Sequence, residues 1–450
     1  MKLPIPKTIR SSKVVPKERE YSVNLFFADN KLLPRPGVEQ LDVEVTSGEC
    51  RGLFVYSERL YGVFGTHLYR YVDNSLVNVG TIEGTDPIKV AKGFNHAAIC
   101  SPNAGNYTLS KTSVLAEITD PDLPTCIDVE VVNGYFIWVP ANGDPLIYSA
   151  VGDAGDIDPL DFFDAEILPD KNAGVVNFRN DLFVLGEDSI ERFRQVGPDD
   201  SPFLRVEGGN IPNGYISGKI LSERAFLFLG RNKEQGPGFF SMEISGAAGR
   251  ISTPAIDEIL EREYSLTELH DCKSQRFQWR GFDVYVFTLR RHSFAFVNGN
   301  WCFFSSELDQ QNLTPWDYQY SVYYNGTFYT AKSGVFGTYS TINTDAGENI
   351  QHSIMTFARH EEKIPFTIDY LTLEVAQGVS DGGSIAISMS RDGKTYSDRY
   401  FIPLGNVGQY EREVEFRVPG GLGQYDGYAG IEIYTTSPIS VAIDNAVIGI

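Results

Sequence analysis

The sequence is poor in sulfur-containing residues and has no long apolar run. It holds 4 Met and five scattered cysteines, Cys50, Cys100, Cys126, Cys272 and Cys302, without a C-x-x-C pair. A sparse, odd set of this kind predicts buried free thiols in a reducing compartment. The first twenty residues lack the apolar centre of a secretory signal, and no stretch is apolar for the length of a membrane span. The sequence therefore predicts a protein made in a cytosol and not inserted in a membrane.

Basic residues are also scarce, with 38 Lys and Arg against 59 Asp and Glu, a formal charge of −21. A general nucleic-acid binder, or a binder of anionic membranes, needs a basic face that replaces counterions. The composition argues against both classes. It leaves open a protein past which DNA slides without adhering.

Helical periodicity is nearly absent. The exception is Thr253–Leu260, where a Thr N-cap, Pro254 at the first helical position and early acidic residues predict a helix start. The rest of the chain alternates short apolar runs with Gly, Asn, Asp and Pro turns, and it holds 29 Phe and 24 Tyr. These features predict an all-β protein with large cores.

The apolar runs repeat. A polar turn, four or five apolar residues, a second turn and a further aromatic run recur near residues 59, 95, 134, 180, 224, 282 and 325. The mean spacing of about 44 residues is that of a four-stranded propeller blade. We expect a β-propeller of six or seven blades, depending on whether the last hairpin closes the ring. The alternative is a series of unrelated β-meanders.

The pattern of apolar and polar residues changes near residue 350. Longer alternating strands follow, with a tight turn expected at Asp392-Gly393 between Ser384–Ser390 and the strand around Phe401. About 100 residues of this pattern predict a β-sandwich. The expected organisation is a basic arm and first strand in 1–45, a β-propeller body in 46–350 and a C-terminal β-sandwich in 351–450.

Two acidic motifs are candidate cation or turn sites. Asp153, Asp156 and Asp158, followed by Asp161 and Asp164, could offer oxygen ligands to calcium, but their spacing does not follow a calcium loop and favours a capped turn into a short helix. The segment Ser390–Tyr396 resembles the Asp-box of sialidase propellers with one residue missing. It occurs once, outside the repeats, and is better interpreted as a hairpin turn.

No catalytic residue, cofactor or firm metal site is predicted. The six His show no metal-ligand spacing, and the sequence has no G-x-S-x-G elbow and no phosphate-binding G-x-x-x-x-G-K loop. Paired acids for glycoside hydrolysis remain open because their separation depends on the fold.

The first twenty residues form a basic segment within an acidic chain. Two readings stay open: an arm that docks on an acidic partner, or a solvated tail. The candidate docking residues are Lys2, Lys7, Arg10, Lys13, Lys17 and Arg19.

Several segments in order resemble one known family. They are Asn180–Gly186 with Ser189–Phe193, Ile251–Leu260, Leu289–Phe296 with Trp301 and Cys302, Ser390–Tyr396 and Ser437–Ile439. From about residue 50 onward, the chain is similar to the packaged-DNA stabilisation proteins, or tail nozzle and hub proteins, of short-tailed bacteriophages.

The resemblance implies a non-enzymatic virion protein, assembled in the host cytoplasm. Such proteins form a homo-hexamer beneath the portal and its head-to-tail adaptor ring, retain packaged DNA and provide the conduit for its ejection. They carry a tail needle or plug and offer surfaces to tailspikes or fibres. DNA would pass the acidic lumen without sequence-specific binding. The alternatives are a β-propeller glycosidase or sialidase, and a glycan-binding adhesin.

Overall fold

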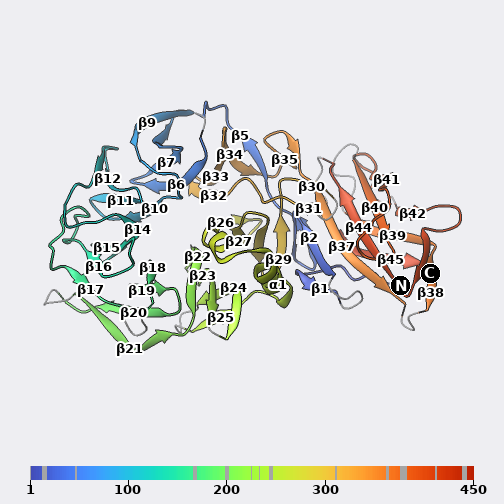
Figure 1. Cartoon of the computed structure of the whole chain (residues 1–450). Helices are drawn as coiled ribbons and strands as arrows, with labels where there is room; N and C mark the ends of the chain where they lie inside the picture. Colours follow the sequence, from blue (N-terminus) through green and yellow to red (C-terminus); the bar gives the residue numbers. More distant parts are fainter. Residues whose placement is uncertain are drawn as a thin grey trace.

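The chain folds into a ring of β-sheets joined side by side to a β-sandwich (Figure 1). The computed structural model describes residues 2–12, 18–45, 48–165, 170–197, 202–223, 225–232, 234–242, 247–309, 312–360, 364–375, 383–410, 413–437 and 443–449. In this part of the chain, seven four-stranded antiparallel blades surround a central opening. The prediction of a propeller followed by a sandwich is confirmed, and the blade number is seven.

The first four blades are built from consecutive strands. Their bounds are β6 (Cys50–Tyr56), β7 (Arg59–Phe64), β8 (His67–Val72) and β9 (Ser75–Thr81); β10 (Lys89–Lys92), β11 (His96–Ser101), β12 (Gly105–Ser110) and β13 (Leu115–Glu117); β14 (Cys126–Val132), β15 (Tyr135–Pro140), β16 (Leu146–Tyr148) and β17 (Phe162–Phe163); β18 (Asn172–Phe178), β19 (Asp181–Gly186), β20 (Ile190–Gln195) and β21 (Phe203–Ile211).

The last three blades complete the ring. They comprise β22 (Gly214–Leu221), β23 (Phe226–Asn232), β24 (Gln235–Met242) and β25 (Ala248–Arg250); β26 (Lys273–Trp279), β27 (Phe282–Thr288), β28 (Ser293–Val297) and β29 (Asn300–Phe304); and β32 (Tyr320–Tyr324), β33 (Thr327–Lys332), β34 (Val335–Ser340) and β5 (Gly37–Gln40). The innermost strands β6, β10, β14, β18, β22, β26 and β32 contact one another in this cyclic order, and β32 contacts β6. The ring is therefore closed.

The strongly apolar repeats become the second strand of each blade, because that strand is covered by neighbouring blades on both faces. In β19 every residue is buried, and β15 is buried from Phe136 to Pro140. Separate apolar clusters lie between successive blades; one of them joins Ile137 and Val139 of the third blade to Val175 and Val184 of the fourth. The seven hairpins read from the sequence thus mark the seven blades.

The seventh blade is closed by an N-terminal strand. β5 pairs with β34 in antiparallel register, with Val38 opposite Tyr339. Val38 is fully buried in the cluster that holds Phe277 and Trp316. Residues from the two ends of the repeat region therefore share one blade, which fixes the ring against opening.

The sandwich also depends on N-terminal strands. One sheet has the order β3 (Leu25–Ala28), β4 (Lys31–Pro34), β45 (Ile443–Gly449), β39 (Tyr370–Val375), β42 (Val414–Arg417). The other contains β37 (His352–Arg359), β44 (Tyr428–Thr435), β40 (Ser384–Ser390) and β41 (Tyr400–Pro403). Leu25 and Leu32 lie in the core between them, beside Ile354 and Ile433.

One strand connects the two halves of the molecule. β2 (Arg19–Val23) pairs on one side with β29 of the sixth blade and on the other with β37 of the sandwich. Blade and sandwich sheet are thus parts of a single ten-stranded sheet that also includes β1 (Arg10–Ser11). The short pairs β30 (Leu308–Asp309) with β31 (Asn312–Leu313), β35 (Thr344–Asp345) with β36 (Glu348–Asn349), and β38 (Pro365–Ile368) with β43 (Gly423–Asp426) complete the strands.

The expected N-terminal arm is wrong for the described residues of 1–45. Leu3 and Ile9 are 0% exposed, the first in the sandwich core and the second beside Trp301. The Leu3 N–H donates to the Ala446 carbonyl at 2.8 Å, and the Ile9 N–H donates to that of Trp301 at 2.9 Å. The segment is too short and polar to fold alone, but distant strands supply its partners.

The predicted helix is confirmed as α1 (Pro254–Glu263), and the Thr253 side chain accepts a hydrogen bond from the Ile256 N–H. A second helix, α2 (Leu266–His270), was not predicted, although Ser265 and Glu268 form a capping box. The S-x-x-E spacing was the available signal. Within the described residues, no helix has the length and apolarity needed to cross a membrane.

Replacing Val38 tests the closure of the ring. We expect V38A to lower the free energy of unfolding by about 2 kcal/mol, because two buried methyl groups are lost without a replacement. A urea titration followed by tryptophan fluorescence measures this change. E39A is the matched control, since Glu39 is the exposed neighbour on the same strand, and it should change the value by less than about 0.5 kcal/mol. Equal effects of the two variants would contradict a closing role for β5.

Candidate functional site

A buried arginine with many hydrogen-bond partners lies where the N-terminal strands meet blades six and seven. Arg35 is 2% exposed. Its Nε donates to Asn24 Oδ1 at 2.8 Å, and its two terminal nitrogens donate to the Asp345 carboxylate at 3.0 and 2.6 Å. The guanidinium also lies 4.9 Å from the ring centre of Trp316. One cation thus joins the N-terminal segment to the end of the propeller.

Asn24 extends this network to the sandwich. Its side-chain amide donates to the carbonyls of Ser305 at 2.9 Å and Gln351 at 2.7 Å, and its Oδ1 accepts the Ser305 N–H at 2.9 Å. Asn24 has φ 58, which asparagine tolerates better than most residues. Asn24 and Arg35 together are defined here as the junction network, with Asp345 as its acid. Asn24 and Arg35 are 1% and 2% exposed, which indicates a structural role for the network.

The predicted docking residues are mostly engaged within the chain. Lys7 lies 4.8 Å from the Phe27 ring centre, Arg10 donates to Glu20 at 2.6 Å, and Arg19 pairs with Glu263 at 3.2 Å. Lys2 is exposed and forms a β-bridge with Val447. Lys13 and Lys17 lie outside the described residues. These side chains hold the first segment on the body, and their docking to a partner stays a prediction.

The acidic cluster forms turns. Asp153 Oδ1 accepts the Gly155 N–H at 3.1 Å, and Asp158 Oδ1 accepts the Leu160 N–H at 2.9 Å. The segment leads into the short strand β17, so the expected short helix is wrong: these carboxylates cap backbone turns and not a helix start. In the part of the chain that the structure describes, Asp153, Asp156 and Asp158 are not grouped with other ligands as a metal site.

The Asp-box-like segment is a loop stabilised by one carboxylate. Asp392 Oδ1 accepts the N–H groups of Lys394 and Thr395, each at 2.8 Å, and the Ser390 hydroxyl at 2.9 Å. These hydrogen bonds hold the pKa of Asp392 well below its usual value. β40 and β41 do pair, but Arg391–Arg399 separates them, so the expected tight turn is wrong. The Asp392 carboxylate closes a longer loop instead.

Exposed apolar side chains lie in the loops of blades two and three. Phe94, in the β10–β11 turn, is 84% exposed and lies under the ammonium of Lys111 at 3.8 Å. The neighbouring Asn95 donates to the Gly152 carbonyl at 3.2 Å, which brings Val151 of blade three next to it. We call Phe94, Val114, Val151 and Leu160, all more than half exposed, the blade 2–3 patch. Large apolar side chains exposed in neighbouring loops are typical of a contact site.

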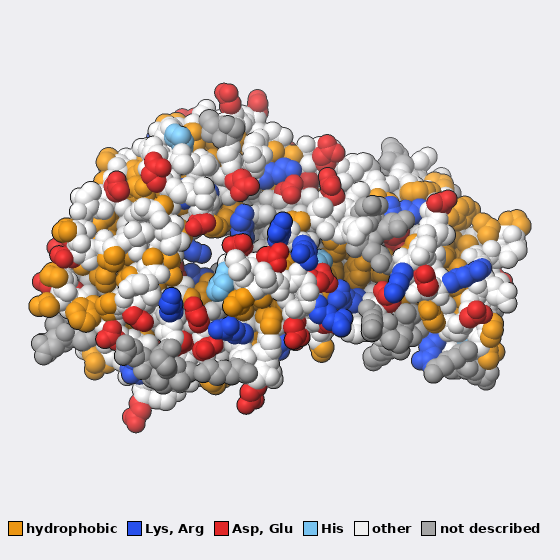
Figure 2. All heavy atoms as spheres, viewed as in Figure 1, with side chains coloured by type: hydrophobic (Ala, Val, Ile, Leu, Met, Phe, Trp, Pro, Cys, Tyr) orange, Lys and Arg blue, Asp and Glu red, His pale blue; other side chains and the backbone are white. Residues whose placement is uncertain are grey.

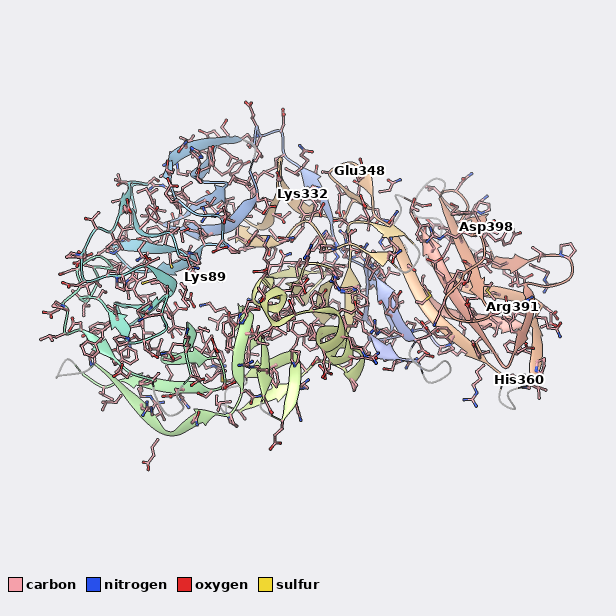
Figure 3. All side chains as sticks on the ribbon, in the orientation of Figure 1. Lys89, Lys332, Glu348, His360, Arg391 and Asp398 are labelled. Atoms are coloured by element: carbon pink, nitrogen blue, oxygen red, sulfur yellow. The ribbon has the colours of Figure 1, made fainter. Side chains whose placement is uncertain are left out.

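The centre of the ring is hollow. A cavity of about 670 Å³ lies between β22, β26, β32, β6 and β10. Figure 2 shows Lys and Arg side chains around the opening, and Figure 3 places Lys89 at its inner edge. Burial lowers the pKa of Lys89, and the nearby Asp128 carboxylate opposes this shift. Sequence reading did not find this site because its residues come from blades far apart in the chain.

Two family models divide the chain. The bacteriophage P22 Gp10 β-propeller model matches residues 19–347, and the bacteriophage P22 Gp10 β-sandwich model matches residues 351–448. The chain belongs to the bacteriophage P22 Gp10 family. It is accordingly a structural protein of a phage tail, and the resemblance read from the sequence is confirmed.

Two solved structures that resemble the chain share little sequence with it. The extracellular domain of the putative hybrid two component system BT4673 from B. thetaiotaomicron has 11% identity and a TM-score of 0.44, covering 85% of this chain and 47% of its own. BamB from Moraxella catarrhalis has 8% identity and a TM-score of 0.37, covering 68% and 99%. A search of curated proteins found no match. The chain spans about half the length of the first of these structures.

Removing Asp345 tests the junction network of this Gp10 family member. D345A leaves the buried Arg35 cation without its acid, so we expect the free energy of unfolding to fall by about 3–5 kcal/mol. D317A is the control, because Asp317 pairs at 3.1 Å with Lys332 near the surface and should cost less than about 1 kcal/mol. Chemical denaturation of both variants measures the difference. A loss for D345A as small as that for D317A would contradict the assignment.

His352 follows Gln351, whose carbonyl accepts from Asn24 of the junction network. Its lowered pKa predicts that the protein is less stable in acid. Burial, helped by the Arg35 charge, lowers the pKa of His352 from 6.5 to about 3. Between these values the unfolded chain binds the extra proton, so this contribution to stability is present above pH 6.5 and is lost as the pH falls. At pH 5 the loss amounts to about 2 kcal/mol.

The test compares pH 7.5 with pH 5.0 by urea titration for the parent and for H352F. The variant should lose about 2 kcal/mol less than the parent on acidification, whatever its own packing costs at pH 7.5. H360F is the control, since His360 is only half-buried and lies at the far end of β37. An identical pH dependence in parent and H352F would overturn the role of His352.

Proposed function

We propose that this protein forms the homo-hexameric hub, or nozzle, of a short-tailed phage, below the portal and its head-to-tail adaptor ring. In this position it retains the packaged DNA, provides the conduit for ejection and carries the tail needle and the tailspikes or fibres. The observation that carries the proposal is the match of the propeller model and the sandwich model to consecutive parts of one chain, 19–347 and 351–448.

The rigid connection between the propeller and the sandwich is consistent with a role in holding DNA under pressure. The propeller and the sandwich share one ten-stranded sheet, and the N-terminal segment is bonded to both. A hub that holds DNA under pressure needs subunits that do not bend internally. A joint made of backbone hydrogen bonds meets that need better than a linker.

The charge suits a conduit. At −21 per chain, six copies surround their axis with a large excess of negative charge. Phosphates gain no counterion release from such a wall, so DNA passes it without adhering. This part of the proposal requires that acidic side chains face the axis of the hexamer.

The blade 2–3 patch is our candidate for the contact between neighbouring copies. In a closed ring the contact is heterologous, so one apolar face meets a different face of the next copy. Phe94 is exposed enough to enter a pocket of that neighbour, and Lys111 beside it can meet the acidic surface of the next chain.

The assembly test uses the full chain, alone and together with the adaptor protein of the same phage. We expect sixfold rings in electron micrographs and a sedimenting species of six times 50.1 kDa per chain. Monomers under both conditions would overturn the hub proposal. A ring of another order would leave the tail role but reject the hexamer.

Two variants test whether the blade 2–3 patch forms the contact between copies. F94E should reduce the ring fraction at least tenfold without changing the circular dichroism spectrum, since a carboxylate cannot be buried in an apolar contact. F401E, at a half-exposed Phe on the sandwich edge, is the matched control and should assemble normally. Normal assembly of F94E would show that the contact between copies does not involve the blade 2–3 patch.

A further inference from the structure

The outer strand of a propeller blade has an open edge, and most blades of this protein protect it. In the described part of the chain, the outer strands β13, β17 and β25 have only two or three residues. The outer strand of blade six, β29, is covered by β2, and that of blade seven, β5, is covered by β35. Short or covered edges offer little to another chain. Two long outer strands remain: β9 of blade one with seven residues and β21 of blade four with nine.

β9 lacks the usual protection of an exposed edge. Its sequence, Ser75–Thr81, contains no charged residue and no proline, although 22% of the chain is charged. Within the described residues it pairs with β8 alone, and Ser75–Asn78 keep a regular register before a bulge at Val79. Val77, in this regular part, is 46% exposed. A neutral edge of this kind is a template for the addition of another strand.

β21 is the second uncovered edge, and its surroundings are also apolar. Leu204 is 53% exposed, and Val196, in the loop that leads to the strand, is 59% exposed. Arg205 is paired with Glu191 at 2.7 Å, so it brings little net charge to the edge. The register with β20 is regular over Phe203–Arg205 and breaks after it. Each edge thus offers one short regular stretch, which restricts strand addition to a defined place.

The two edges lie on different sides of the propeller. Blades one and four are three blades apart in the ring of seven, and Figure 1 shows β9 at the upper rim and β21 at the lower rim, with the sandwich away from both. The two strands do not meet within one copy. A closed ring of identical chains needs two different faces on each chain, one for each neighbour. β9 and β21 meet this requirement.

β9 is continuous with the blade 2–3 patch. Gly80 packs directly against the Leu115 side chain of blade two, and Leu115 follows Val114 of the patch in the chain. Val79 and Leu115 also belong to one apolar cluster. A neighbouring copy that covers the patch therefore lies next to the open edge of β9.

We propose that β9 of one copy pairs with β21 of the next copy, so that blade one and blade four of neighbouring chains join into one sheet at each contact of the hexamer. This inference rests on the hub proposal and names the strands that make the contact. Val77 then packs beside Leu204 and Val196. Backbone hydrogen bonds between two edges fix the orientation of the neighbours, and a neutral strand at the contact limits the repulsion between chains of charge −21.

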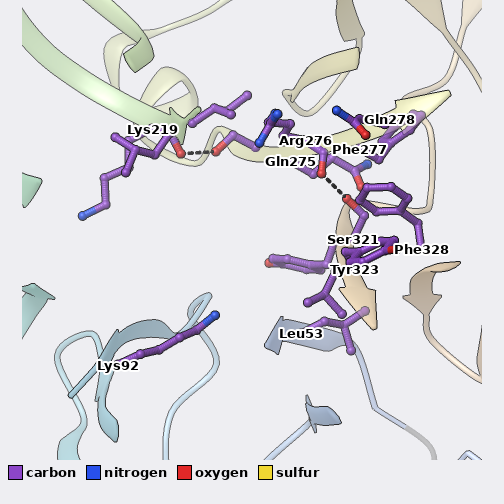
Figure 4. A pocket seen from close by; sticks show the side chains of 15 residues that line it. Leu53, Lys92, Lys219, Gln275, Arg276, Phe277, Gln278, Ser321, Tyr323 and Phe328 are labelled. Carbon is purple, nitrogen blue, oxygen red and sulfur yellow. Dashed lines mark hydrogen bonds between the residues drawn. The ribbon is translucent and has the colours of Figure 1, made fainter. Parts of the chain in front are cut away.

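The contact leaves the centre of each propeller open. The central cavity is lined from the innermost strands, by residues that include Leu53, Lys92 and Lys219 (Figure 4). β9 and β21 are outermost strands, and no residue of either lines the cavity. The propeller therefore enters the ring without a change at its centre.

The test is disulfide cross-linking of the full chain, mixed with the adaptor protein of the same phage. On mild oxidation, V77C/L204C should form linked multimers of up to six chains, because the two positions that meet belong to different copies. The five native cysteines are buried and stay out of the reaction. V77C/F401C is the matched control, since Phe401 is about as exposed as Leu204 but lies on the sandwich edge, and it should give no multimers.

Each outcome separates this inference from the hub proposal. Rings without cross-links in V77C/L204C would overturn the pairing of β9 with β21 and leave the hub standing. Linked dimers of the single variant V77C would also overturn it, because they would show β9 pairing with itself. Monomers with and without the adaptor would overturn both.

A variant without introduced cysteines tests the same edge. V77K places a charge on the regular part of β9, so we expect the fraction of rings in sedimentation to fall by about tenfold or more. V77T should assemble like the parent, because threonine keeps the shape and the strand preference of valine. V407K, at an exposed valine of the sandwich, is the matched control. A ring fraction in V77K equal to that of V407K would contradict the role of β9.

Discussion

The structure depends on the insertion of its first strands into two distant places. β5 provides the fourth strand of the last blade, and β2 lies between a blade and a sandwich sheet. Between them sits Arg35, whose charge is buried and met by Asn24 and Asp345. A buried cation tolerates no missing partner, so the three segments that supply its acceptors are held in one arrangement. Ring closure and the joint to the sandwich are therefore one event and not two.

The sequence predicted the features that are local. The second strands of the first five blades are largely buried, so they must be largely apolar, and the hairpins that contain all seven second strands recur at a regular spacing. The start of helix α1 is likewise predicted by Thr253, whose side chain accepts the Ile256 N–H, and by Pro254, which has no N–H that needs a partner. Patterns of this kind depend only on residues close together in the chain, so they can be recognised without knowing the fold.

The sequence did not predict the features that depend on residues far away in the chain. Leu3 and Ile9 stand among prolines and charges and look solvated, but they are buried against residues some 300 to 440 positions later. The cavity could not be predicted for the same reason, because Lys92, Lys219 and Arg276 come from three separate blades.

The closing strand has a consequence for the order of folding. A chain is synthesised from its N-terminus, so Val38 leaves the ribosome long before Tyr339, its partner in the last blade. β5 has no partner in its blade until β34 has been made. Closure of the ring therefore requires the chain to extend at least through β34 and Asp345. A shorter chain lacks the partners of β5 and Arg35. A chain that stops before β34 leaves the edge of β5 unpaired, and an unpaired strand edge is a site for association with other chains.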